Sequence, residues 1–222
     1  MKRVLVIAFI TGLIGASEVG AVTVYNQPSN YPTGAIFTSV NDTDSGGIGN
    51  FATVYDNFTL ANTTSITDVH WQGAFIFDPP ISQFTLTFWG DVAGAPGASL
   101  STYAIPGNAN ETLVDVAQQV YNYSVDLPAP FVATGGTNYW LSIVPDLSAA
   151  GGATVWGWHS GTDGDGKAIQ EIQGLGRSFQ QTDMAFSLTA EGTGGNPVPE
   201  PMTAGLGLLS LGGLALYLRR RR

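Results

Sequence analysis

Large apolar side chains occupy every second position in several short segments of the chain. The pattern is clearest at residues 84–88, 139–143 and 184–188, where most of the intervening residues are polar or small. A period of two puts alternate side chains on opposite faces of a β-strand, so each segment predicts a strand with one buried face. Similar patterns predict further strands at residues 22–25, 53–60, 66–77, 100–105, 112–125, 154–159 and 168–172.

Clusters of Gly, Pro, Asn, Asp, Ser and Thr separate these segments, as turns do in all-β domains. No part of residues 22–191 carries a convincing helical stripe, although residues 114–120 have the composition for a single helical turn. About ten short strands in one domain favour two packed sheets. We therefore predict an all-β fold, a single antiparallel β-sandwich or jelly-roll-like domain over residues 22–191.

The N-terminus has the three parts of a secretory signal peptide. Two basic residues, Lys2 and Arg3, precede an apolar stretch at residues 4–14, and small residues follow at 19–21. This order predicts a signal helix over residues 1–21 that signal peptidase removes before Val22 or, alternatively, after Ala16.

The C-terminus has a second apolar segment. Residues 203–218 carry no charge, and a helix of this length spans about 24 Å, just short of the ~30 Å hydrocarbon core. Several glycines weaken its insertion, so we expect a marginal transmembrane helix that inserts transiently. The arginines that follow it stay cytoplasmic and place the preceding chain on the far side of the membrane. Residues 192–197, which are glycine-rich, form a linker between the domain and this tail.

The tail at residues 198–222 resembles the PEP-CTERM sorting signal of Gram-negative bacteria. The resemblance rests on the Pro-Glu-Pro motif, the apolar segment and the arginine cluster in that order, with the sorting residues Val198, Pro199, Glu200, Pro201, Arg219, Arg220, Arg221 and Arg222. It implies recognition and cleavage by an exosortase and delivery to the cell surface or the exopolysaccharide matrix. Whether the tail is cleaved or retained as an anchor stays open. The middle of the chain loosely resembles secreted bacterial β-sandwich domains, through residues 56–60, Trp71, residues 84–88, Pro96-Gly97 and residues 137–141.

The charge of the domain limits its partners. Of the eight Lys and Arg residues in the chain, only Lys167 and Arg177 lie within residues 22–191, while most of the seventeen acids do. An acidic surface repels nucleic acid and anionic lipid, so we expect neither as a partner. The chain contains no cysteine, so we expect no disulfide and no cysteine-ligated metal.

Two loops alternate acids with small residues, as some calcium loops do. One contains Asp42 and Asp44 and the other Asp163 and Asp165. Calcium takes six to eight oxygen ligands, which carboxylates and backbone carbonyls of such a loop can supply. The alternative is that these are ordinary Asp/Gly turns, since Lys167 follows directly on the second loop.

Tryptophans are the other candidate binding residues. Exposed rings stack on sugars, whereas buried rings fill a core. The strand pattern places Trp89 and Trp140 on outward faces, and Trp156 and Trp158 share one face of a strand. His70 and His159 adjoin tryptophans in strands and are interpreted as structural.

No motif of a nucleophilic, phosphate-binding or metal-dependent enzyme occurs, and we assign no catalytic residue. We predict a non-enzymatic structural or adhesion protein of the exopolysaccharide or biofilm. A carbohydrate-binding module is the alternative. A glycan-active hydrolase, which needs only two carboxyl groups, is the second alternative.

Overall fold

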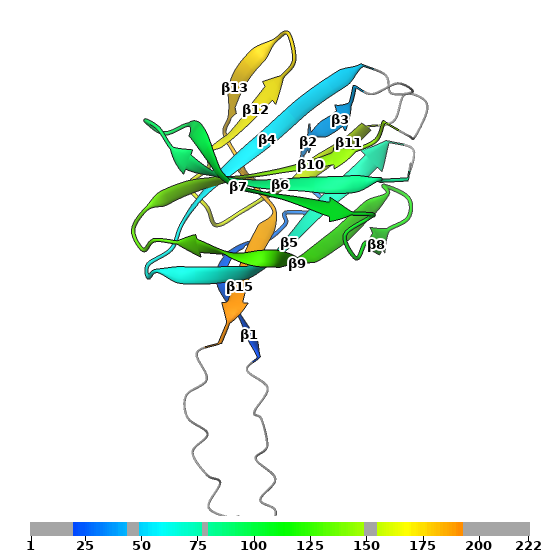
Figure 1. Cartoon of the computed structure of the whole chain (residues 1–222). Coiled ribbons are helices and arrows are strands. Elements are labelled where there is room, and N and C mark those ends of the chain that lie inside the picture. Colours follow the sequence, from blue (N-terminus) through cyan, green and yellow to red (C-terminus); the bar gives the residue numbers. More distant parts are fainter. Residues whose placement is uncertain (1–19, 44–48, 77–79, 149–154, 193–222) are drawn as a thin grey trace, which may run out of the picture. The chain divides into compact units, whose positions relative to one another are not determined.

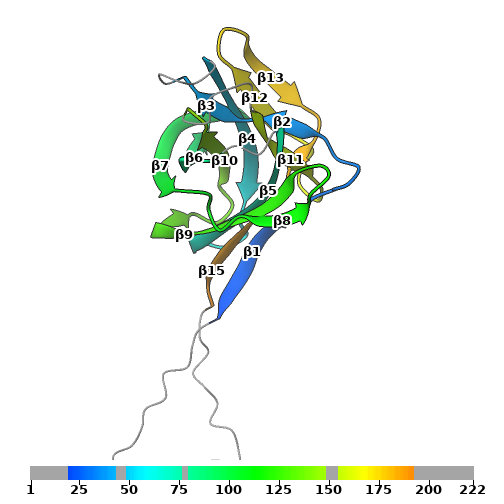
Figure 2. The same cartoon turned by 90° about the vertical axis from the view of Figure 1, so that its right-hand side faces the viewer.

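A computed structural model describes residues 20–43, 49–76, 80–148 and 155–192, and these form strands and turns with no helix. The strands belong to two sheets that lie as two layers (Figures 1 and 2). The prediction of an all-β domain is therefore confirmed. The two layers follow from the alternation described above, because each sheet has one apolar face to bury.

The first sheet has eight strands and contains both ends of the domain. Its main path runs β1–β15–β5–β11–β14, while β9 lies along the other side of β5, β8 pairs with β9 and β2 pairs with β11. The strands are β1 (Ala21–Gln27), β2 (Ile36–Thr38), β5 (Thr64–Ile76), β8 (Thr112–Asp115), β9 (Val120–Ala133), β11 (Val155–Gly161), β14 (Asp183–Met184) and β15 (Phe186–Glu191).

The second sheet has seven strands in the order β13–β12–β4–β3–β10–β6–β7, and β4 also pairs with β10. They are β3 (Val40–Asp42), β4 (Asn50–Thr59), β6 (Gln83–Asp91), β7 (Pro96–Pro106), β10 (Asn138–Asp146), β12 (Ala168–Ile172) and β13 (Gly176–Gln180). The pairing of β10 with β3 is parallel, through Asp146 and Asn41, and the other pairings between described strands are antiparallel.

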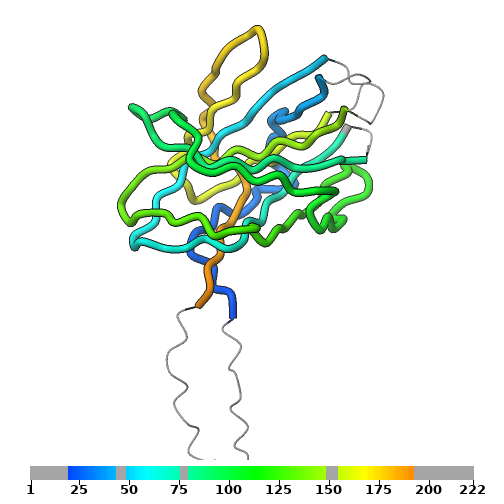
Figure 3. Tube along the Cα trace, in the orientation of Figure 1, coloured from blue at the N-terminus to red at the C-terminus, as the bar shows by residue number. Residues whose placement is uncertain are grey.

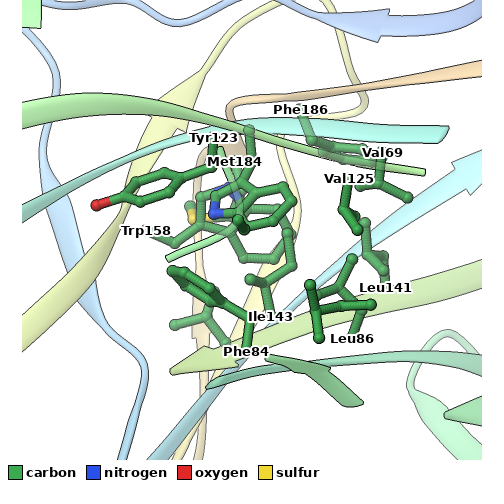
Figure 4. Close-up of a cluster of buried hydrophobic side chains, with 14 of the residues drawn as sticks. Val69, Phe84, Leu86, Tyr123, Val125, Leu141, Ile143, Trp158, Met184 and Phe186 are labelled. Atoms are coloured by element: carbon green, nitrogen blue, oxygen red, sulfur yellow. The ribbon is translucent and has the colours of Figure 1, made fainter. Parts of the chain in front are cut away.

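The core lies between the two sheets and is rich in aromatic rings. Phe88 of β6 and Phe131 of β9 stack with ring centroids 4.2 Å apart, which joins one sheet to the other. Figure 4 shows Phe84, Leu86, Leu141 and Ile143 facing side chains of the first sheet. Because these residues come from the period-two segments, the sequence pattern correctly identified the inward faces.

The first and last strands of the domain are neighbours. Ala21 of β1 pairs with Glu191 of β15, and the tube in Figure 3 runs side by side at these two ends. In β5 the backbone of Gly73 approaches Trp156 so closely that a Cβ would lie 2.2 Å from the indole. A side chain there would displace a fully buried ring of β11.

Two predicted features differ from the structure, and three short strands were not predicted. The segment at 112–125 is two strands, β8 and β9, because residues 116–119 form a turn, which also replaces the expected helical turn. The short strands β2, β3 and β13 were missed, since three to five residues show too little periodicity. Residues 1–19 of the predicted signal helix, the C-terminal helix and all but the first residue of the linker lie outside the described residues, whereas Ala21, the last residue predicted for the signal, begins β1. Among the described residues, no helix has the length and hydropathy needed to cross a bilayer.

Candidate functional site

The outer face of the first sheet carries a row of polar side chains that strand pairing brings together. Asn26 of β1 pairs with Ser187 of β15, Ser187 pairs with His70 of β5, and His70 pairs with Ser124 of β9. Their chain neighbours on these strands, such as Val69 and Leu188, point into the core. The row therefore crosses four strands on the side of the sheet that faces away from the core.

A second row lies beside the first and is linked by hydrogen bonds. Gln72 pairs with Asn122, and Asn122 pairs with Thr112 of β8. Ser29 Oγ donates to Gln72 Oε1 at 2.5 Å, and Gln72 Nε2 donates to Asn122 Oδ1 at 3.0 Å. This chain orients the Gln72 amide, which is almost fully buried, while Asn122 stays exposed.

The two rows border a cavity of about 520 Å³ on this outer face. We call the following set the polar face: Asn26, Ser29, His70, Gln72, Thr112, Asn122, Ser124 and Ser187. Its members other than His70 carry hydroxyl or amide groups, which donate and accept hydrogen bonds without charge. The polar face therefore presents many uncharged hydrogen-bonding groups around one cavity.

A third row continues from the polar face and ends in two acids. Thr189 pairs with Asp68 of β5, and Asp68 pairs with Asp126 of β9. Partial burial raises the pKa of Asp68, but hydrogen bonds from Asp126, Thr67 and Thr189 outweigh it and lower the pKa below the ordinary value. The hydrogen bond to Asp68 raises the pKa of Asp126. The hydrogen bond between the two carboxyl groups thus shifts their pKa values in opposite directions, down for Asp68 and up for Asp126.

The two histidines have different surroundings. His70 is exposed on the polar face, whereas His159 of β11 is buried. His159 Nδ1 lies 3.0 Å from the carbonyl oxygen of Ser160 and 3.3 Å from Ser29 Oγ. A carbonyl oxygen only accepts, so Nδ1 carries the proton and cannot act as a base toward Ser29. The burial of His159 fits the structural role predicted for it, whereas His70, also predicted to be structural, borders the cavity described above.

Three of the four tryptophans predicted as sugar-stacking platforms are buried. Trp156 and Trp158 are 0% exposed and Trp140 is 1% exposed, and Trp89 is half-buried. Trp156 and Trp158 belong to the core between the sheets, as Figure 4 shows for Trp158. The carbohydrate-stacking role predicted for Trp140, Trp156 and Trp158 is therefore wrong, because no face of these rings is open to a ligand.

Trp140 and Trp89 do point away from the main core, as the strand pattern predicted. They are adjacent across β10 and β6 and pack in a small second cluster with Tyr55 and Ile169. Ala95, from the loop between β6 and β7, lies against this cluster. The loop thus covers an outward face that the sequence pattern leaves open.

The predicted calcium loops do not converge on one place. Asp163 and Asp165 lie by a cavity of about 380 Å³, where Asp165 Oδ2 accepts hydrogen bonds from Lys167 Nζ at 3.0 Å and Asn57 Nδ2 at 3.1 Å. Asp42 is buried at the end of β3, and Asp44 lies outside the described residues. Among the residues that the structure describes, no three His, Asp or Glu side chains meet as a metal site would require. Calcium binding by these loops stays a prediction.

Asp183 explains the shape of the second loop. Its carboxylate accepts hydrogen bonds from the backbone of Gly164 at 3.1 Å and of Gly166 at 2.7 Å. The acidic side chain therefore holds a glycine turn in place, which is the ordinary structural use of aspartate in turns. The sorting residues of the tail, 198–201 and 219–222, lie outside the described residues.

The polar face was not identified from the sequence. Its residues come from five separate segments, and only the pairing of β1, β15, β5, β9 and β8 brings them together. The available signal was the series of polar residues at alternate positions of predicted strands, such as His70 and Gln72 on one strand and Asn122 and Ser124 on another.

Comparisons with known proteins agree with the two-part organisation of the chain. Comparison with curated proteins and with solved structures finds no match. Residues 197–222 match the PEP-CTERM protein-sorting motif, so the resemblance of the tail is confirmed and the chain is an exported protein sorted by an exosortase. Residues 25–189, well over half of the chain, match the family described as a domain of unknown function (DUF7901). The chain belongs to the DUF7901 family.

Proposed function

We propose that the β-domain is a non-enzymatic, polysaccharide-binding protein of the cell surface or the extracellular matrix. The observation that carries the proposal is the cavity of about 520 Å³ bordered by in-register rows of hydroxyl and amide side chains. A sugar presents many hydroxyl groups that donate and accept hydrogen bonds, and such rows match them. The sorting motif supports export to the cell surface or extracellular space, where the domain could meet such polymers.

A neutral polysaccharide suits the site better than a charged one. The polar face offers uncharged groups apart from His70, and the surrounding domain is acidic. The acidic domain repels polyanions. The expected ligand is therefore a polymer of neutral hexoses.

The geometry favours binding over catalysis. Ser29 Oγ donates its hydrogen bond to Gln72 Oε1, and His159 Nδ1 donates to the Ser160 carbonyl oxygen, so this Ser–His contact lacks a base. Asp68 and Asp126 are in direct hydrogen-bond contact. Glycoside hydrolases hold their two carboxyl groups about 5–10 Å apart to accommodate the sugar and water. These two observations weigh against the hydrolase alternative.

Affinity electrophoresis of the exported protein tests the proposal. Gels containing soluble dextran, mannan or galactan should retard the wild-type protein with at least one polymer. The variant with His70→Ala and Asn122→Ala, both exposed positions, should run with little retardation. Asn62→Ala, an equally exposed asparagine in the turn before β5, is the matched control and should behave as wild type. Equal retardation of all three proteins would place the binding site elsewhere.

A further inference from the structure

A further cavity lies on the outer face of the other sheet. It has a volume of about 530 Å³ and is lined by Asn41, Thr43, Phe51, Tyr55, Glu171 and Gln173. The main-core residues of β4, Ala52 and Val54, alternate with Phe51 and Tyr55, so this cavity opens on the side facing away from the core. It shares no lining residue with the polar face.

An exposed aromatic ring sits between two amides in this cavity. Phe51 is 40% exposed, although it is a large apolar residue on a strand. Asn41 of β3 pairs with Phe51 on one side, and the Gln173 backbone N–H donates to the Phe51 carbonyl at 3.0 Å on the other. The ring is thus flanked on both sides by side chains that donate and accept hydrogen bonds.

Glu171 supplies a fixed acceptor beside the ring. Its Oε2 accepts from Arg177 Nε at 2.8 Å and from the Tyr55 hydroxyl at 3.3 Å. These two contacts hold the carboxylate in one orientation, and the guanidinium balances its charge. Glu171 Oε1 has no hydrogen-bond partner among the described residues and remains available to a ligand.

Other polar groups of the cavity are also available. The Asn41 side chain uses Oδ1 to accept from Thr43 Oγ1 at 2.9 Å, while its Nδ2 has no partner within the described part of the chain. The Gln173 side-chain amide likewise makes no hydrogen bond to a described residue. The cavity therefore combines one apolar ring with donors and acceptors around it.

We propose that this cavity, the Phe51 site, binds a pyranose ring of a neutral polysaccharide. A pyranose has an apolar C–H face that stacks on an aromatic ring, and hydroxyl groups at its edge. The face would cover Phe51 while the hydroxyls bond to Asn41 Nδ2, Glu171 Oε1 and the Gln173 amide. The Arg177–Glu171 ion pair leaves this site without a strong net charge, which suits an uncharged sugar.

With the polar face, the Phe51 site makes the domain bivalent. This bivalency rests on the proposed function, whereas the Phe51 site itself does not. The two sites lie on outer faces of opposite sheets, so one protein can hold two polysaccharide strands. A bivalent binder cross-links a polymer network with no further contact between protein copies.

The test uses the exported protein with Phe51→Ala, with His70→Ala and Asn122→Ala together, and with all three changes. Leu175→Ala is the matched control, because Leu175 is an exposed apolar residue of the β12–β13 turn outside the cavity. Isothermal titration with oligosaccharides cut from dextran, mannan and galactan gives the stoichiometry. Light scattering of protein mixed with the intact polymers reports cross-linking.

We expect two binding sites per wild-type chain and one in each of the first two variants, with loss of scattering in both. Loss of the stacking ring should weaken the Phe51 site about tenfold or more. Phe51→Trp keeps the stacking surface and should change its fluorescence when the sugar binds.

The outcomes separate the two claims. Two sites in Phe51→Ala, or unchanged Phe51→Trp fluorescence under saturating sugar, would overturn the Phe51 site. If only the His70/Asn122 variant loses binding, the proposed function is supported and binding at the Phe51 site is contradicted. If only Phe51→Ala loses binding, the Phe51 site is supported and binding at the polar face is contradicted. Absence of binding by the wild-type protein to all three sugars would overturn both.

Discussion

Trp140 Nε1 donates a hydrogen bond to Asp91 Oδ1 across 2.8 Å, and this contact ties the β6–β7 loop to the outer face of the second sheet. The same oxygen accepts from Asn138 Nδ2 at 2.9 Å, and Asp91 Oδ2 accepts from the backbone N–H of Gly94 at 3.1 Å. Partial burial raises the pKa of Asp91, but these hydrogen bonds outweigh it and lower the pKa. The Asp91 carboxylate therefore holds the loop in place and also accepts the hydrogen bond of the buried Trp140 N–H.

Asp91→Ala should destabilise the protein by about 1–3 kcal/mol, because the buried Trp140 N–H loses its acceptor. Urea unfolding measures this loss, and a red shift of tryptophan emission should accompany the opening of the loop. Asp91→Asn retains an acceptor and should cost less. Equal stability of wild type and Asp91→Ala would show that the loop does not depend on this contact.

Asp56 predicts a dependence of stability on pH. Its side chain is fully buried and accepts a hydrogen bond from the backbone N–H of Met184 at 2.5 Å, which links β4 to β14. Burial raises the pKa of Asp56 well above its ordinary value. A raised pKa in the folded state stabilises the protein at low pH, and this stabilisation is lost as pH rises through the folded pKa.

Asp56→Asn removes this titration. As pH rises above about 4, the wild-type protein should lose stability relative to Asp56→Asn, by up to about 1.4 kcal/mol per pH unit, until Asp56 is ionised. Urea unfolding of both proteins from pH 4 to pH 8 measures the difference. A constant difference across this range would contradict the raised pKa.

The Asp68–Asp126 pair predicts a second, local effect of pH. Because the hydrogen bond to Asp68 raises the pKa of Asp126, the shared proton is present at low pH and is lost as pH rises through that raised pKa. Asp126→Asn keeps a donor to Asp68 without the titration. We expect the melting temperature of the wild type to fall relative to Asp126→Asn as pH rises. Parallel melting curves would show that no proton is shared.

The sorting motif predicts a shortened mature protein. Cleavage near Pro199–Pro201 by an exosortase would remove Arg219–Arg222, which hold four of the eight basic residues of the chain. Intact mass spectrometry of the surface-released protein should show a C-terminus near this motif. Retention of all four arginines would indicate that the tail serves as a permanent anchor.

The sequence predicted the fold better than it predicted the site. Alternation identified the inward face at residues 84–88, 139–143 and 184–188, because burial alone decides that choice. The alternation placed Trp140 correctly on the outward face. The prediction that Trp140 is exposed there was wrong, because the loop at Ala95 covers the ring and carries no periodic signal. The polar face depends on register between strands far apart in the chain, such as His70 with Ser187, and local patterns do not encode that register.

The most direct test of the polar face uses the two histidines of the chain, His70 on the polar face and the buried His159. Ring-selective NMR of the exported protein, recorded during titration with a neutral polysaccharide, follows both side chains at once. We predict that the His70 signals shift in proportion to the bound ligand, with a much smaller change at His159. Saturating binding that leaves the His70 signals unmoved would contradict a polysaccharide site on the polar face.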